Sequence, residues 1–224
     1  KDFVIRGKKL GEKNKLLHAL SDVSFDIYEG ETLGIIGESG CGKSTLGRCL
    51  VKLHKPSGGT ITYNGKDLWN MPVYDREAAR RDIQMIFQDP YSSLNPRMTV
   101  ANIIGEGLLA HKYCKKANER MHEEILQTME DCGLAPYFLH RYPHQFSGGQ
   151  RQRIGIARSL AVHPKFVVCD EAVSALDVSI QSQIINLLQD LKEQQHLTYL
   201  FITHDLAVVR QIADDVIVME KGKL

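Results

Sequence analysis

The stretch Leu33-Gly-Ile-Ile-Gly37-Glu-Ser-Gly-Cys-Gly-Lys43-Ser44 decides the fold of this chain. It begins with a short apolar run, Leu33 to Ile36, of the kind that forms a buried strand. The residues from Gly37 to Ser44 then match the pattern GxxxxGKS, and a helical stretch from Thr45 to Leu53 follows. A strand, a glycine-rich loop and a helix in this order predict a phosphate-binding loop.

Each residue type in this loop suits the binding of phosphate groups. Glycines let the backbone curl so that successive N–H groups face phosphate oxygens, and the helix N-terminus adds positive potential. Lys43 is expected to reach the β and γ phosphates and Ser44 to ligate Mg²⁺. The motif alone leaves open an ordinary glycine turn beside a surface lysine. The residues expected to contact a nucleotide are Gly37, Glu38, Ser39, Gly40, Cys41, Gly42, Lys43, Ser44 and Thr45.

Further apolar runs extend the strand pattern along the chain. Helical stretches separate most of them, and buried strands that alternate with helices predict a largely parallel sheet. The runs are Ile83 to Phe87, Phe166 to Cys169, Tyr199 to Thr203 and Val216 to Met219.

The N-terminal part predicts antiparallel strands as well. Val23, Phe25 and Ile27 alternate with polar residues, which is typical of a half-exposed strand. Residues 60–63 followed by Asn64-Gly65 predict a hairpin, because Asn-Gly supplies the positive φ angles of a two-residue turn.

Between Pro90 and Pro164 the pattern changes to one helix after another. Apolar positions at Met121, Ile125, Leu126 and Met129 are three or four residues apart, and Gly133 is expected to cap the helix. We therefore expect a helical subdomain at residues 90–163, inserted into a nucleotide-binding α/β core formed by residues 1–89 and 164–224.

Composition excludes several classes of protein. Lys plus Arg is 28 and Asp plus Glu is 27, so the chain lacks the net basic charge of a protein that coats nucleic acid, and we expect no nucleic-acid partner. No apolar run is longer than the four residues from Phe166 to Cys169, which is far short of a membrane span. The 5 cysteines contain no CxxC pair, which favours a reduced compartment over a disulfide framework or a zinc site.

Two carboxylates end the predicted strand at 166–169. Ligand sites of parallel sheets lie at the carboxyl ends of strands, so Asp170 is expected to hold the Mg²⁺ shell and Glu171 to polarise a water molecule. His204 follows another predicted strand and emerges at the same edge. Taken singly, these residues also fit solvated acids and a structural histidine.

A second anion-binding helix start lies at Phe146-Ser147-Gly148-Gly149-Gln150. A hydroxyl and bare N–H groups at the beginning of a helix suit an anion, although an N-capped helix after a glycine loop gives the same pattern. The chain therefore contains two candidate phosphate-binding helix starts.

The order of these motifs resembles the ATP-binding subunit of ABC transporters, from about Leu17 to Leu224. The motifs are the phosphate loop, Gln88, FSGGQ, the strand ending in Asp170-Glu171, Ser174 to Asp177, and His204. The resemblance implies an ABC ATPase fold: a P-loop NTPase core with a mainly parallel sheet, N-terminal antiparallel strands and an inserted helical subdomain.

The resemblance also implies a role for each matching residue. Gln88 is similar to the glutamine that contacts Mg²⁺ and the attacking water, and His204 to the histidine that contacts the γ-phosphate. Ser147, Gly148, Gly149 and Gln150 resemble the signature that binds the γ-phosphate of ATP held by another subunit, and Asp177 resembles the aspartate at that subunit interface. Glu171, His204 and Gln88 are then the catalytic candidates, and Ser44, Gln88 and Asp170 the metal candidates.

Membership of this family would imply that the chain uses ATP and Mg²⁺ as cofactors and binds several partner proteins. These are a second ATPase subunit, identical or different, transmembrane permease subunits, and an extracytoplasmic substrate-binding protein. The location implied is peripheral, on the cytoplasmic face of the plasma membrane. The loop from Asp89 to Pro96 would then lie beside a coupling helix of the permease.

The segment from Gln88 to Arg97 and the residues Val178-Ser-Ile-Gln resemble the dipeptide, oligopeptide and nickel importer branch. We expect uptake of dipeptides or oligopeptides, with a nickel importer as the alternative, since Ala172 replaces the usual proline as in some nickel-type subunits. A non-transport ABC ATPase would require a long coiled coil or a second ATPase cassette, and these 224 residues contain neither. A P-loop kinase would leave FSGGQ, Asp170-Glu171 and His204 without a joint purpose.

Overall fold

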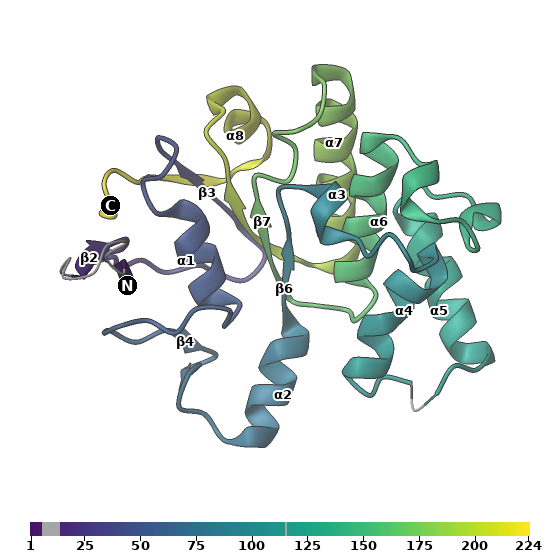
Figure 1. Cartoon of the computed structure of the whole chain (residues 1–224), viewed down its shortest axis with the longest axis horizontal. Helices are drawn as coiled ribbons and strands as arrows, with labels where there is room; N and C mark the ends of the chain where they lie inside the picture. Colours follow the sequence, from purple (N-terminus) through teal and green to yellow (C-terminus); the bar gives the residue numbers. More distant parts are fainter. Residues whose placement is uncertain (6–13, 115) are drawn as a thin grey trace.

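A computed structural model of the chain describes residues 1–5, 14–114 and 116–224. Its centre is a five-stranded sheet in which every neighbouring pair is parallel, in the order β6-β7-β8-β3-β9. The strands are β3 Thr32–Ile36, β6 Ile83–Ile86, β7 Phe166–Asp170, β8 Thr198–Ile202 and β9 Asp215–Val218. They coincide with the five apolar runs of the sequence, so the predicted parallel sheet is confirmed (Figure 1).

Helices cover both faces of this sheet. The helices are α1 Lys43–Leu50, α6 Gly148–Leu160, α7 Val178–Gln195 and α8 Leu206–Ile212. Successive residues of β7 point to opposite faces, because Val167 and Cys169 belong to one apolar cluster and Val168 to another. The first cluster contains buried residues of α6, α7 and α8, and the second contains Leu46 of α1. The helix that follows the phosphate loop therefore covers one face, and the helix that follows FSGG covers the other.

The regular elements that the structure describes between β6 and β7 are all helices. Its elements are α3 Pro90–Ser93, α4 Val100–Ala110, α5 Glu119–Asp131, η1 Pro136–Phe138, η2 Pro143–Gln145 and α6. Met121, Ile125 and Met129 are buried, as their spacing predicted. Gly133, at φ 66°, ends α5, and the amide of Leu134 donates to the carbonyl of Met129 at 2.8 Å. The division into a 90–163 subdomain and a core stays a prediction.

Short antiparallel pairs flank the sheet. They are β1 Asp2–Ile5 with β2 Lys15–His18, and β4 Thr62–Tyr63 with β5 Lys66–Asp67. Asn64 and Gly65 lie at φ 49° and 73°, so the predicted Asn-Gly turn is confirmed. The remaining helix, α2 Val73–Asp82, leads into β6.

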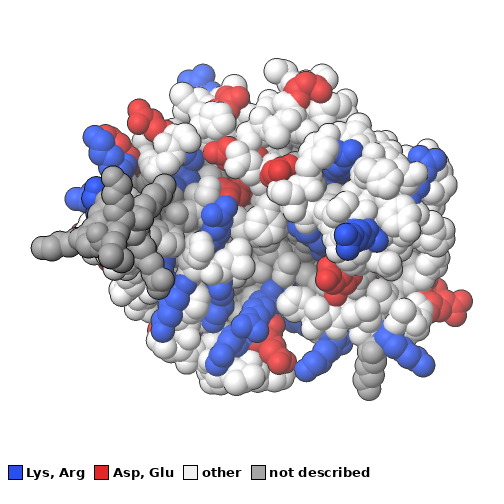
Figure 2. Space-filling view, viewed as in Figure 1, with Lys and Arg blue, Asp and Glu red and all other residues white. Residues whose placement is uncertain are grey.

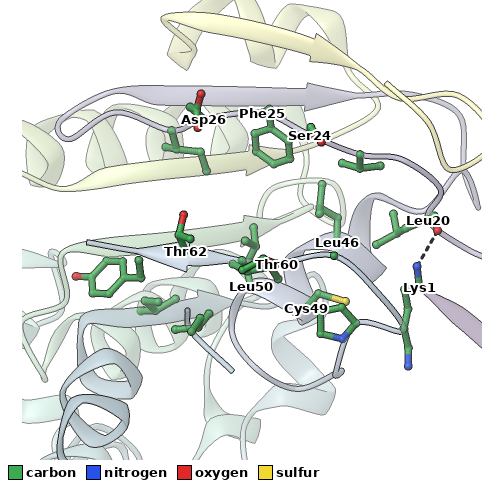
Figure 3. A pocket seen from close by; sticks show the side chains of 18 of the residues that line it. Lys1, Leu20, Ser24, Phe25, Asp26, Leu46, Cys49, Leu50, Thr60 and Thr62 are labelled. Atoms are coloured by element: carbon green, nitrogen blue, oxygen red, sulfur yellow. Dashed lines mark hydrogen bonds between the residues drawn. The ribbon is translucent and has the colours of Figure 1, made fainter. Parts of the chain in front are cut away.

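The prediction of a strand at Val23 to Ile27 is wrong. Val23, Phe25 and Ile27 are half-buried and alternate with exposed Ser24 and Asp26, but no ladder pairs this segment. A cavity of about 1240 Å³ separates it from residues 58–64, and Figure 3 shows Phe25 facing Thr60 across that space. Alternating burial reflects the apolar surface beneath the segment, whereas a strand also needs a neighbouring backbone at hydrogen-bonding distance.

The first helix also differs from its prediction. The sequence predicted a helix from Thr45 to Leu53, and the structure has Lys43–Leu50. Lys52, at φ 63°, adopts the left-handed conformation that stops a helix. The helix therefore begins inside the phosphate loop itself.

The surface agrees with the balanced composition. Both acidic and basic side chains lie on the face drawn in Figure 2, and the basic ones gather on its lower part. Among the residues that the structure describes, no helix has the length and apolar character to cross a membrane.

Candidate nucleotide-binding site

The phosphate loop joins β3 to α1 at the carboxyl end of the sheet. Gly42 has φ 114°, and a Cβ there would lie 2.5 Å from the carbonyl oxygen of Ala19. A Cβ on Gly37 would lie 2.1 Å from the carbonyl oxygen of Met219. Side chains at these positions would collide with backbone, so the tight curl of the loop requires glycine at both.

Lys43 lies inside this curl. Its side chain is buried, and its ammonium donates to the carbonyls of Gly37 at 2.6 Å and Glu38 at 2.9 Å. Gly42, the N-cap of α1, has no side chain to accept from the first helical amides, and the first turn carries no acidic residue. The loop therefore combines a buried positive charge with a helix start that suits an anion.

Ser44 and Asp170 place a hydroxyl and a carboxylate side by side next to the loop. The Ser44 hydroxyl donates to Asp170 Oδ1 at 2.7 Å, and the Asp170 side chain is buried at the end of β7. Burial raises the pKa of Asp170, and the Ser44 hydrogen bond and Arg48 oppose the rise. A hydroxyl and a carboxylate fit Mg²⁺, which takes few protein ligands and completes its shell with phosphate and water. The described residues contain no cluster of three or more metal-binding side chains.

Glu171 is the point where three predicted catalytic residues meet. Gln88 Nε2 donates to Glu171 Oε2 at 2.7 Å, and His204 Nδ1 lies 3.7 Å from the same oxygen. Gln88, Glu171 and His204 follow β6, β7 and β8, which are neighbours in the sheet. The Glu171 carboxylate can accept a proton from a water molecule while an amide and an imidazole hold it in place.

The backbone of Glu171 fixes the direction of its side chain. Its φ is 49°, in the left-handed region, and its amide donates to the carbonyl of Ile202 at 2.9 Å. This conformation costs a non-glycine residue on the order of 1 kcal/mol. The sequence placed Glu171 at a strand end but carried no signal for this turn of the backbone.

The FSGGQ segment begins α6 as an N-capped helix. The Ser147 hydroxyl accepts from the amide of Gln150 at 3.3 Å, and the Gln150 side chain accepts from the amide of Ser147 at 3.1 Å. Ser147 is exposed and Gly148 half-buried, so both reach the surface. The helix start is preorganised, because the two residues satisfy each other's free backbone groups.

Asp177 occupies the equivalent position on α7. Its carboxylate accepts from the amide of Ile180 at 3.0 Å and from the hydroxyl of Ser179 at 2.7 Å. The hydrogen bond from the Ile180 amide, followed by the one from the Ser179 hydroxyl, lowers the pKa of Asp177. The side chain is therefore a charged helix cap at the surface.

The structure does not bring the two anion-binding helix starts together. The phosphate loop begins α1 on one face of the sheet, whereas Ser147 begins α6 on the other face. In the described ranges no hydrogen bond or ion pair joins residues 37–45 to residues 147–150. A single chain thus presents two separate candidate sites for phosphate.

Arg48 and Arg151 are two residues near the site that sequence reasoning missed. Arg48 opposes the rise that burial causes in the pKa of Asp170, and its spacing of four from Ser44 on α1 was a signal that could have found it. Arg151 contacts the ring of Tyr91, a contact between distant parts of the chain that no local pattern announces.

Gly149 and Gly148 differ in the space around them. A Cβ on Gly149 would lie 2.6 Å from a methyl carbon of Ile180, whereas a Cβ on Gly148 would lie 3.6 Å from Leu176. We expect Gly149→Ala to lower the free energy of unfolding by about 1–3 kcal/mol, because it overpacks the contact between α6 and α7. Urea unfolding measures this, with Gly148→Ala as the matched control. Equal stability of the two variants would contradict the packing seen here.

Comparison with known proteins places these motifs in context. The sequence profile of a family described as "ABC transporter" matches residues 20–174. The chain is 54% identical over 212 residues to the oligopeptide transport ATP-binding protein OppF of Bacillus subtilis (strain 168), covering 92% of this chain and 68% of that protein. It is 52% identical over 221 residues to the dipeptide transport ATP-binding protein DppF of Lactococcus lactis subsp. cremoris (strain MG1363), covering 98% and 69%.

A solved structure is similar over nearly the whole chain. It is the dimeric, post-hydrolysis state of the ATP-binding cassette MJ0796 bound to ADP and Pi, with a TM-score of 0.83 and 31% identity. The match covers 99% of this chain and 94% of that one. The fold therefore agrees with that of a known ATP-binding cassette.

Proposed function

The chain belongs to the ABC transporter family, and from that premise we propose that it is the ATP-binding and ATP-hydrolysing subunit of an importer of dipeptides or oligopeptides. The observation that carries the proposal is the convergence of Gln88 and His204 on Glu171, next to the Ser44–Asp170 pair. Peptide cargo is favoured over nickel because both relatives above, each more than half identical to this chain, are peptide transport proteins by name.

ATP is held by the phosphate loop in this proposal. The backbone from Gly37 to Thr45 and the Lys43 ammonium offset the negative charge of the β and γ phosphates. Ser44 and Asp170, with Gln88, hold Mg²⁺, which when bound offsets further charge on the phosphates. Glu171 takes a proton from water, while His204 and Gln88 keep the carboxylate and the water in position.

Assembly follows from the separation of the two anion sites. Ser147 to Gln150 bind the γ-phosphate of ATP held by a second ATPase subunit, and Asp177 lies at the same interface. The dimeric cassette of known structure supports such pairing. The second subunit is either another copy of this chain or a related one. The helical subdomain at 90–163 carries the signature, and the core at 1–89 and 164–224 carries the phosphate loop.

Permease subunits are the partners of the assembled pair. The segment from Asp89 to Pro96, predicted as a loop, contains the short helix α3 and joins β6 to the helical subdomain, and a permease helix docks beside it. The chain is then peripheral on the cytoplasmic face of the plasma membrane, and an extracytoplasmic binding protein delivers the peptide. ATP hydrolysis by the reconstituted importer, stimulated by peptide-loaded binding protein, tests this assignment.

Lys43→Ala tests the nucleotide site itself. Loss of the buried charge is expected to raise the dissociation constant for Mg-ATP by on the order of 10- to 100-fold, the effect of losing a charge-assisted hydrogen bond. A titration with a fluorescent ATP analogue measures it. Lys66→Ala is the control, because Lys66 is exposed on the β4–β5 hairpin and pairs with Asp75 at 2.8 Å. Equal affinity of Lys43→Ala and wild type would remove Lys43 from the site.

A further inference from the structure

Two arginine residues on one side of α6 hold the segment that carries Gln88. Arg151 and Arg158 are seven residues apart, which is about two helical turns. Arg158 Nη1 donates to the carbonyl of Ser93 at the end of α3. In the next position, the Ser159 hydroxyl donates to the carbonyl of Met85 in β6 at 3.1 Å. α6 is thus attached to the chain on both sides of Gln88.

Arg151 contacts both the ring of Tyr91 and the backbone just before Ser147. Its guanidinium carbon lies 3.8 Å from the centre of the Tyr91 ring. Its Nε donates to the carbonyl of Pro143 at 2.7 Å and its Nη2 to that of His144 at 3.4 Å. These carbonyls belong to η2, just before Ser147. Arg151 therefore joins three segments: α3, η2 and the first turn of α6.

The Tyr91 ring is one of the few groups that stabilise the buried guanidinium of Arg151. The residue is only 8% exposed, its Nη1 has no hydrogen-bond partner, and no described carboxylate lies within ion-pair distance. A cation removed from water gains more from an aromatic face than an exposed one does. The ring and two carbonyls are the groups that stabilise this guanidinium, so moving Tyr91 away would leave it poorly compensated.

Tyr91 is in turn linked to the catalytic carboxylate. The amide of Tyr91 donates to Asp89 Oδ1 at 2.8 Å, which begins α3 one residue after Gln88. The Tyr91 side chain is 65% exposed, so core packing does not fix it and the Arg151 contact does. A continuous set of contacts runs from Glu171 through Gln88 and Asp89 to Tyr91 and Arg151.

We propose that the Tyr91–Arg151 stack is a positioning contact that ties Ser147 to Gln88. The inference rests on the proposed function, in which Gln88 serves the ATP on its own subunit and Ser147 serves the ATP on the partner. A shift of α3 is then passed to the start of α6, so that the two ATP sites respond to each other. Arg151 and Tyr91 touch no reacting atom and act through Gln88 and Ser147.

The test replaces the aromatic face while keeping an apolar side chain. Tyr91→Leu is expected to lower the hydrolysis rate of the reconstituted importer about fivefold, in line with a partly buried cation–π contact. ATP affinity at the phosphate loop of the full chain should stay at the wild-type value, because in the described residues no hydrogen bond, ion pair or ring contact joins Tyr91 to residues 37–45. Tyr91→Phe keeps the ring and should keep the rate.

Tyr137→Leu is the matched control. Tyr137 is 70% exposed and also has an arginine over its ring, Arg141 at 5.6 Å, but it lies on η1. The rate of this variant should equal that of the wild type. A fivefold loss in Tyr137→Leu as well, or an equal loss in Tyr91→Phe and Tyr91→Leu, would overturn the proposal.

Hydrogen exchange decides the inference without hydrolysis. In the full chain, Tyr91→Leu should speed amide exchange at residues 147–150, and Tyr91→Phe should not. Unchanged exchange in Tyr91→Leu would show that the stack does not link the two segments. Absence of hydrolysis in the wild-type importer would instead count against the proposed function, and the exchange result would still stand.

Discussion

Glu171→Gln is expected to slow ATP hydrolysis by on the order of 10²-fold or more while leaving the affinity for ATP near its wild-type value. The amide has the shape of the carboxylate and can still accept the hydrogen bond from Gln88. It lacks the negative charge that takes a proton from water. Binding and chemistry therefore separate at this residue, because the phosphate loop does not depend on Glu171.

Single-turnover hydrolysis by the reconstituted importer and ATP titration of the full chain measure the two effects. ATP should also hold the variant subunits in a closed pair, which size-exclusion chromatography detects. Glu124→Gln is the matched control, since Glu124 also lies beside a histidine, His163, with 3.2 Å between Oε2 and Nε2. A Glu171→Gln variant that hydrolyses ATP at nearly the wild-type rate would transfer the role elsewhere, with His204 the next candidate.

Much of the fold could be predicted because local patterns and tertiary structure agree. The buried runs beginning at Leu33 and Phe166 became neighbours of the same central strand, β8, since parallel strands covered on both faces must be apolar throughout. Asn64-Gly65 formed its turn because two consecutive positive φ angles suit few other residue pairs. In both cases the residues themselves restrict the conformation.

Other features depend on partners distant in the sequence. The alternation at Val23 to Ile27 indicates which side chains face the core, but it says nothing about whether another backbone lies close enough to pair. The Tyr91–Arg151 stack joins residues 60 positions apart. The left-handed backbone of Glu171 is held by a hydrogen bond from its amide to the carbonyl of Ile202 in the next strand. Such contacts follow from the assembled fold and not from any window of sequence.

Gly148→Asp is expected to lower the rate of ATP hydrolysis by on the order of 10²-fold or more, while ATP still binds at the phosphate loop of the same chain. Gly148 is the first residue of α6 and reaches the surface beside Ser147. An added carboxylate there would meet the γ-phosphate held by the partner subunit with both bulk and like charge. The two subunits would then fail to close, because the added carboxylate repels the ATP bound to the partner and not the ATP of its own subunit.

The structure separates this effect from misfolding. A Cβ at Gly148 has ordinary contact distance to Leu176, and an acidic residue in the first turn of a helix is favourable. The variant should therefore unfold at the wild-type urea concentration, unlike Gly149→Ala. Gly148→Asn adds nearly the same bulk without the charge. Comparing its hydrolysis rate with that of Gly148→Asp separates the steric effect of the substitution from the electrostatic effect.

Gly58→Asp controls for the added charge, because Gly58 is exposed and a Cβ there meets no atom within 4 Å. ATP binding is measured on each variant alone, and hydrolysis after reconstitution with the partner ATPase and permease. Since α1 and α6 lie on opposite faces of the sheet, a charge at Gly148 should not reach the phosphate loop of its own chain.

Loss of ATP binding by Gly148→Asp alone would mean that both helix starts bind one nucleotide. Full hydrolysis in the reconstituted complex would mean that no partner phosphate approaches Ser147. Either result would rule out an ATP shared between two subunits.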